Sequence, residues 1–132
     1  MTVKFTKKEK DNMAAVLNLA KCNIAQCEKQ LNSFFDHSFK NSVPKMTQAI
    51  NNRDEKQLID VCQKSNSSKQ TKDLIECSLS KCNKQYRKHT TNEAKNAKLP
   101  PPPKKITLEY AQKVNNAKCV NASKAIIQKK MK

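Results

Sequence analysis

The residues of this sequence with the clearest chemistry are its six cysteines. They form two similar sets, Cys22, Cys27 and Cys62 in the first half and Cys77, Cys82 and Cys119 in the second. The first two cysteines of each set lie five positions apart, which on an α-helix separates them by about 140° around the axis. Each thiol of such a pair faces a different neighbour. The spacing therefore predicts disulfides that join one helix to two others.

The same spacing argues against a metal centre or a redox site. A structural zinc site more naturally uses C-x2-C with histidines at matching spacing, and the sequence has only His37 and His89. The C-x-x-C motif of thiol oxidoreductases is missing. We therefore expect no metal and no cofactor.

Two arguments narrow the disulfide pairing without choosing one scheme. If each half is cross-linked internally, one of its two closely spaced cysteines bonds to the third cysteine of the same half. The one unpaired cysteine left in each half then forms a disulfide between the halves. Simple antiparallel hairpins instead place each turn midway between bonded residues. That condition favours Cys22–Cys62 and Cys82–Cys119, and it leaves Cys27–Cys77. This last scheme breaks the repeat symmetry, and the pairing stays open at this point.

Residues that could act in catalysis are scattered. Acid–base or nucleophilic chemistry needs a nucleophile beside a base, or paired carboxylates in a pocket. The isolated candidates are Asp36, His37, Asp54, Glu55, Ser67, Ser68 and His89. Neighbours on a helix point apart, loop serines usually cap helices, and a histidine on an apolar seam is usually packed. We predict that the protein is not an enzyme and has no small-molecule substrate.

The cysteine pattern belongs to a longer internal repeat. Residues 21–31 read KCNIAQCEKQL and residues 76–86 read ECSLSKCNKQY. In each half a proline, Pro44 or Pro101, stands eighteen residues before the third cysteine. Two lysine-rich helices could resemble each other by chance, but the proline and the third cysteine agree independently of the local match. The pattern indicates a tandem duplication of a helix, a proline-marked turn and a second helix.

Composition and periodicity favour helices throughout. The chain has no glycine, which argues against hairpin-rich β folds and phosphate-cradling loops. Thr6 and Glu9 have capping-box spacing, and apolar residues at steps of four and three then predict one continuous helix with the inner seam Met13, Leu17, Ala20, Ile24, Cys27, Leu31 and Phe34. A second helix is expected from Pro44, with a possible interruption at 51–55, and a third helix has the seam Ile75, Leu79, Cys82, Tyr86 and His89. A fourth helix opens at Thr107.

These elements predict one all-α domain over residues 1–132. Its expected architecture is a small, disulfide-stapled four-helix bundle made of two tandem αα-hairpins, at 6–65 and 68–131. The proline run at 100–103 is an extended connector, because proline cannot occupy a helix interior.

The charge is large and unevenly distributed. The net charge is +16, and residues 64–132 hold 17 basic against four acidic residues, compared with ten against seven in residues 1–63. Such a surface suits a polyanion: nucleic acid, anionic lipid headgroups or an acidic protein. The expected contact residues are Lys104, Lys105, Lys113, Lys118, Lys124, Lys129, Lys130 and Lys132.

The cysteines and the N-terminus together raise a question of compartment. No apolar run approaches the ~18 residues of a membrane span, and the first residues lack the features of a secretory signal. Bridged cysteines need an oxidising environment. We therefore expect a virus particle with its own thiol-oxidation pathway or, alternatively, the mitochondrial intermembrane space.

In its abundance of lysine, asparagine and cysteine, the whole chain resembles the minor virion proteins of large icosahedral DNA viruses. The resemblance implies a place in or beneath a capsid, many copies and non-catalytic work. The paired cysteines on helices also resemble the twin-cysteine hairpins of the mitochondrial intermembrane space, although those use C-x9-C or C-x3-C spacing.

The expected function is that of a structural protein, a helical cement component that binds other structural proteins of an assembly such as a capsid. One alternative is a sequence-independent nucleic-acid-binding or packaging protein that uses the lysine-rich C-terminal half. A further alternative is a helical-hairpin subunit of a mitochondrial complex in the intermembrane space.

Overall fold

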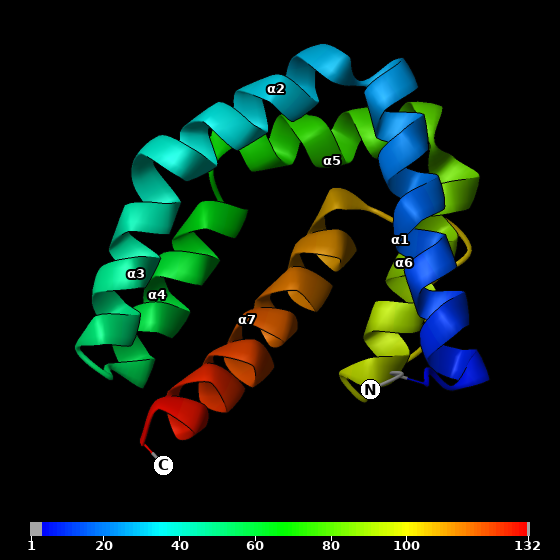
Figure 1. Cartoon of the computed structure of the whole chain (residues 1–132). Coiled ribbons are helices and arrows are strands. Elements are labelled where there is room, and N and C mark those ends of the chain that lie inside the picture. The colour runs from blue at the N-terminus through cyan, green and yellow to red at the C-terminus, as the bar shows by residue number, and fades with distance from the viewer. Residues whose placement is uncertain (1–3, 132) are drawn as a thin grey trace.

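The computed structural model describes residues 4–131, and all regular structure in this range is helical (Figure 1). The elements are α1 (Lys7–Gln26), α2 (Glu28–His37), the π-helix η1 (Ser38–Ser42), α3 (Val43–Asn51), α4 (Glu55–Asn66), α5 (Lys69–Lys81), α6 (Asn83–Asn96) and α7 (Leu108–Met131). The all-α prediction is confirmed. The predicted count of four helices is wrong, because three of the four expected helices are each divided in two.

Two of these divisions occur at equivalent cysteines of the repeat. Cys27 has φ −129° and ψ 32°, and Cys82 has φ −125° and ψ 34°, both outside the helical region. Backbone hydrogen bonds run up to each cysteine and resume from it. Cys27 N–H donates to Asn23 O at 2.7 Å and Cys27 O accepts from Leu31 N–H at 2.8 Å, and Cys82 makes the same two bonds with Ser78 O and Tyr86 N–H, both at 2.8 Å. Each half therefore contains a bent helix rather than the predicted straight one.

The first helix begins where it was predicted to begin, but the predicted hairpin turn after it does not form. The N–H of Glu9 donates to the Thr6 hydroxyl at 3.1 Å, and the N–H of Thr6 donates to Glu9 Oε1 at 3.2 Å, which completes the capping box. No hairpin turn forms near residue 42. The chain instead continues through η1 into α3, where Pro44 occupies the first turn, a position that needs no N–H donor. The reversal comes after α3, at 52–54.

Both α3 and α6 end in a left-handed residue although the chain lacks glycine. Arg53 has φ 54° and Lys98 has φ 58°. At the second site Lys98 N–H donates to Lys95 O at 3.1 Å and Leu99 N–H donates to Ala94 O at 2.9 Å, which is the Schellman pattern. Arg53 and Lys98 therefore adopt the left-handed conformation that glycine adopts without steric cost.

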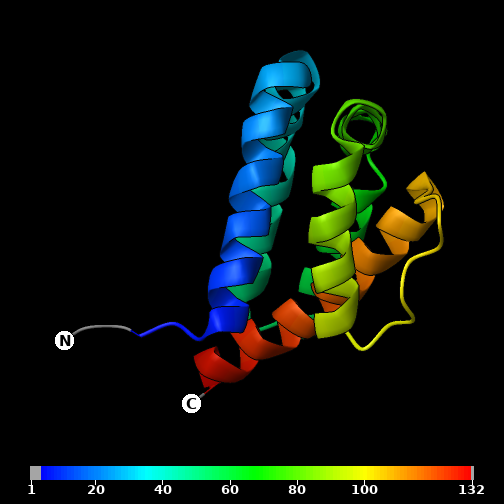
Figure 2. The same cartoon turned by 90° about the vertical axis from the view of Figure 1, so that its right-hand side faces the viewer.

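The helices form two layers, which Figures 1 and 2 show from two sides. One layer follows the chain from α1 to α3, and the second follows it back from α4 to α6. Across the layers α1 packs on α6, α2 on α5 and α3 on α4. Helix α7 crosses the molecule and packs on α3, α4, α5 and α6, but not on α1 or α2. The pairs α1–α6, α2–α5 and α4–α7 each take one helix from each repeat, whereas the equally extensive pair α3–α4 lies within the first repeat.

The proline run is held against the second layer. The Arg87 guanidinium donates to Lys104 O at 2.8 Å and to Pro103 O at 3.0 Å. The Tyr110 hydroxyl donates to Pro100 O at 3.1 Å. The predicted extended connector at 100–103 is therefore fixed at both ends.

All six cysteines form disulfides, and each bridge crosses from one repeat to the other. The bridges are Cys22–Cys82, Cys27–Cys77 and Cys62–Cys119. In the repeat Cys22 corresponds to Cys77, and Cys27 corresponds to Cys82. An internal twofold axis thus exchanges the first two bridges and maps the third bridge onto itself.

Of the pairings weighed from the sequence, Cys27–Cys77 is present. Cys22–Cys62 and Cys82–Cys119 are wrong, as is any bridge within one half. The error came from the hairpin assumption, which placed the helices of one repeat side by side. Because the bent helices pair across the repeats instead, α1 makes no contact with α4.

Contacts between the two bent helices obey the same internal symmetry. Ser78 and Asn23 are equivalent positions, both are buried, and the Ser78 hydroxyl donates to Asn23 Oδ1. On either side, Cys22 Sγ lies 3.9 Å from Lys81 O and Cys77 Sγ lies 3.8 Å from Gln26 O. The two bridges and this hydrogen bond form the junction of the repeats.

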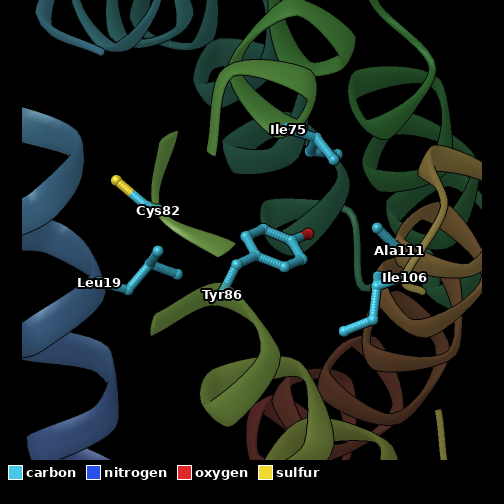
Figure 3. Packing of buried hydrophobic residues seen from close by; sticks show 6 residues of the cluster. All are labelled: Leu19, Ile75, Cys82, Tyr86, Ile106 and Ala111. Carbon is cyan, nitrogen blue, oxygen red and sulfur yellow. The ribbon is translucent and has the colours of Figure 1, made fainter. Parts of the chain in front are cut away.

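The main apolar core lies beside this junction, between the two layers and α7. It consists of Leu19, Ile75, Cys82, Tyr86, Ile106 and Ala111, and Figure 3 shows the Tyr86 ring between Leu19 and Cys82 on one side and Ile106 and Ala111 on the other. Burial raises the pKa of the Tyr86 hydroxyl to about 12, although its hydrogen bond with Thr90 opposes the shift. A smaller cluster of Ala49, Leu58 and Ile127 lies where α3, α4 and α7 meet.

Tryptic mapping without reductant tests the pairing. The peptide 22–29 contains both cysteines of the first pair, so we expect one species in which it is joined to both 73–81 and 82–84. A second species should join 57–64 to 119–124. Mass spectrometry would identify both, and a species that joins 22–29 to 57–64 would contradict the pairing across repeats.

Substitution of Lys98 by glycine should stabilise the protein. Glycine removes the steric cost of the left-handed conformation, which outweighs its greater freedom in the unfolded chain, so we expect a gain of about 0.5–1 kcal/mol in the free energy of unfolding. Lys95→Gly, three residues earlier inside α6, is the control and should lose about 1 kcal/mol. Urea unfolding followed by circular dichroism measures both, and a loss in the Lys98 variant would overturn this account of the cap.

Candidate functional site

Most residues that could have acted in catalysis have local structural roles. Asp36 pairs with Lys40 at 3.0 Å, the Asp54 carboxylate caps α4 by accepting from Gln57 N–H at 3.0 Å, and the Ser68 hydroxyl caps α5. Ser67 donates to Gln63 O, and His37 Nδ1 lies 3.2 Å from Asn41 Nδ2. Within residues 4–131 no three His, Cys, Asp or Glu side chains lie close enough together to hold a metal ion.

His89 lies in a small cluster of ionisable groups between α6 and α7. Its Nδ1 is 3.9 Å from Glu93 Oε1, and Lys118 Nζ is 3.3 Å from Glu93 Oε2. Burial lowers the pKa of His89; Glu93 opposes this shift and Lys118 adds to it. Lys118 satisfies the carboxylate, so the cluster joins the two helices and leaves the imidazole largely packed.

The lysines predicted to contact a polyanion are not brought to one face. Lys104 and Lys105 are exposed in the connector before α7, and Lys118 is engaged by Glu93. Along α7 the helical rotation of about 100° per residue leaves Lys113 and Lys124 on one side of the helix and turns Lys129 and Lys130 away from them. Lys132 lies outside the described residues.

The most prominent surface feature is an apolar stripe along α1. Its members recur at steps of three and four, and all are exposed: Met13, Val16, Leu17, Ala20 and Ile24. Leu17 and Ile24 are the most exposed of the large side chains in this stripe, with exposed fractions of 58% and 59%. Further exposed apolar side chains follow on the next elements, Phe35, Phe39 and Val43. We call the five α1 residues the α1 stripe.

The α1 stripe corrects the predicted inner seam of the first helix. The buried line of α1 is Ala15, Leu19 and Asn23, followed by Cys27. Residues 12–20 contain no charge, and their apolar side chains cover more than one face of the helix. Periodicity correctly predicted a helix, but it assigned the exposed face of α1 as the buried one. A charge-free arc wider than one buried face is the signal that could have revealed a second contact surface.

The internal twofold shows what covers the equivalent surface in the other repeat. Ala20 and Ile24 correspond to Ile75 and Leu79 of α5. Ile75 belongs to the main core and Leu79 packs against it, together with Ile106, two residues before α7, and Ala111 in the first turn of α7. Because neither α4, the counterpart of α7, nor α7 itself packs on α1, the first repeat lacks this cover.

Comparison of the chain with protein-family models, with curated proteins and with solved structures found no match. What the structure defines is a class of architecture: a duplicated, all-α protein whose two halves are interlocked by three disulfides. Within residues 4–131 no helix combines the length and apolarity needed to cross a membrane.

The pKa of His89 predicts a loss of stability in mild acid. Its folded-state pKa lies below the ordinary 6.5, so the unfolded chain binds the proton more tightly and stability falls as pH drops through about 6.5. We expect the melting temperature to fall between pH 7.5 and pH 5.5, and to fall less in His89→Gln. Thr91→Gln, at an exposed position of α6, should keep the wild-type slope. An NMR titration midpoint for His89 above 6.5 would refute the predicted direction.

Proposed function

We propose that this protein is a non-catalytic structural component that binds into a larger assembly through the α1 stripe. The observation behind the proposal is that two equivalent surfaces are covered unequally. The start of α7 packs on the surface of α5 that contains Ile75 and Leu79, whereas the equivalent surface of α1, with Ala20 and Ile24, is exposed. Apolar patches that a folded protein leaves exposed commonly mark interaction sites. A rigid, cross-linked framework presents such a patch with little loss of conformational entropy on binding.

The occupant we propose is an amphipathic helix of a different protein. In the second repeat the equivalent flank accommodates Ile106 and the first turns of α7, so residues of this size fit the surface. Lys10 borders the stripe on α1, which favours acidic residues at the edge of the partner helix. Two copies of a chain with net charge +16 would repel, which disfavours a homodimer across this face.

The compartment we propose follows from the disulfides, which favour an oxidising environment. The composition continues to favour a virion, in or beneath the capsid, and the intermembrane space is the alternative. Sequence-independent nucleic-acid binding is the second candidate function. The observation that supports it lies in a groove between α1 and α6, not in the dispersed lysines of α7.

Polar substitution of the α1 stripe tests the structural role. Leu17→Gln with Ile24→Gln should leave the melting temperature nearly unchanged, because both side chains are exposed. We expect the variant, tagged and expressed in the native host, to leave the fast-sedimenting assembly fraction that contains the wild type. Ile126→Gln with Met131→Gln, which alters exposed apolar residues of α7, is the matched control and should sediment with the assembly.

Two outcomes would count against the proposal. If the α1 variant sediments with the assembly as the wild type does, the stripe is not the binding surface. If the wild-type protein in native extract sediments only as a free 15.0 kDa chain, the structural role itself is wrong.

A further inference from the structure

A groove runs between α1 and α6 on the flank of α1 opposite to the α1 stripe. It has a volume of about 900 Å³, and four cationic side chains line it, namely Lys21, Lys84, Arg87 and Lys88. Asn18, Gln85 and Asn92 add amide groups, and no carboxylate of the described residues lies in its wall. The apolar residues in its wall are small: two alanines and one cysteine of α1.

The groove continues into a second hollow of about 290 Å³ toward the end of α6. Lys88 and Asn92 line both hollows, and Lys7, Lys8 and Lys95 add further positive charge against the single carboxylate of Asp11. From Lys84 to Lys95 the cations span eleven residues of helix, about 16 Å at 1.5 Å per residue. The site is thus long and continuous, which suits an extended polyanion better than a small anion.

The internal twofold provides a comparison within the same molecule. The equivalent groove between α2 and α5 has about 610 Å³ and keeps three matching residues, since Lys29, Gln30 and Cys77 correspond to Lys84, Gln85 and Cys22. Its charge is different. Asp73 and Glu76 stand where the first groove has Asn18 and Lys21, and Ser33 stands in the place of Lys88.

The acidic residues of the α2/α5 groove also offset part of its positive charge. Lys69 Nζ lies 3.1 Å from Asp73 Oδ2, and Lys81 lines the same wall as Glu76. One scaffold therefore appears twice, once with mixed charge and once with cations alone. Burial and packing do not require this difference, because both grooves share the same backbone arrangement.

We propose that the α1/α6 groove binds the phosphate backbone of a nucleic acid. Its polar groups are ammonium, guanidinium and amide donors, the types that contact phosphate and sugar oxygens. An acidic helical peptide would need apolar pockets at i and i+4 spacing, and this groove has only small apolar side chains. Asn92 lines both hollows and adds an amide to the shared wall.

The groove predicts binding without sequence preference. Lysines act as point charges, and the Arg87 fork is already engaged by two connector carbonyls, so it contributes charge but not bidentate base contacts. No aromatic side chain lines either hollow, which removes stacking as a source of preference. Affinity should therefore depend steeply on salt. The α1 stripe lies on the other flank, so this inference does not rest on the docking proposal.

The test uses substitutions that the twofold mate already accommodates. Lys21→Glu with Lys88→Ser places the residues of the α2/α5 groove into the α1/α6 groove. Lys29→Glu with Lys81→Ser makes the same change of charge in the α2/α5 groove and is the matched control. Binding of a fluorescent 20-nucleotide oligothymidine is followed by anisotropy from 50 to 300 mM NaCl, with melting temperatures checked for every variant.

We expect the wild type to bind at 50 mM salt and the first variant to lose at least tenfold in affinity. Its slope of log K against log salt should be smaller by about 1.4, the loss of two phosphate contacts to a single strand. The control should stay within about threefold of the wild type. As a second readout, photo-crosslinking to an oligonucleotide that contains 4-thiothymidine should label peptides of α1 and α6.

Equal losses in the two variants would show that diffuse charge rather than the groove binds the oligonucleotide, and would overturn the proposal. Absence of wild-type binding at 50 mM salt would also overturn it. Binding of a polyglutamate peptide in place of the oligonucleotide would assign the groove to an acidic protein instead. Crosslinks confined to α7 would show that the C-terminal lysines bind the oligonucleotide, and would contradict the proposed groove site.

Discussion

The structure depends on the two disulfides that cross between the repeats where each helix bends. Cys27 and Cys82 are among the largest side chains that are fully buried, together with Val114 and Ser78. In a chain with few aromatic residues, sulfur atoms thus occupy positions that larger apolar side chains fill in other small proteins. A disulfide typically contributes about 2–4 kcal/mol, against a total of about 5–15 kcal/mol for a native domain. The bridges are therefore part of the core rather than an addition to it.

Bridging across the repeats also determines how the halves are arranged. Each half alone is a bent helix and a following helix, with little apolar surface that it can cover by itself. Joined at the junction of Asn23 and Ser78, the bent helices cover each other, and α4 and α7 pair as the third symmetric contact. The duplication thus behaves like a dimer within one chain, with covalent bonds where a dimer has an interface.

The surfaces depart from the symmetry of the framework in two places. Helix α7 covers the flank of α5 and leaves the equivalent flank of α1 bare, because the first repeat inserts α3 where the second has the proline connector. The paired grooves differ in charge on the same backbone. A framework held by disulfides tolerates such changes, since exposed side chains can change without loss of the contacts that maintain the fold. The two proposed sites use this freedom on opposite flanks of one helix.

Much of the local structure follows from the sequence by short-range rules. The capping box of Thr6 and Glu9, the helical class and the extended proline run were predicted, because caps, propensity and periodicity depend on residues within a few positions of each other. The predicted proline-marked turn is absent from the first half, where Pro44 lies in α3. The bend at Cys27 and the continuation through η1 were not predicted, since both halves of each bent helix have good helical sequence. The left-handed caps at Arg53 and Lys98 also lacked the glycine that usually marks them.

By itself, then, the sequence determined which segments are helical, that cysteines cross-link them and that the unit occurs twice. Only the tertiary structure decided which helices are neighbours. The pairing of Cys22 with Cys82 and the exposure of Leu17 and Ile24 follow from that choice, as does the gathering of Lys21 and Lys88 in one groove. The physical reason is that periodicity gives the direction of a side chain around its own helix axis. Which face is buried depends on the packing of segments far apart in the chain.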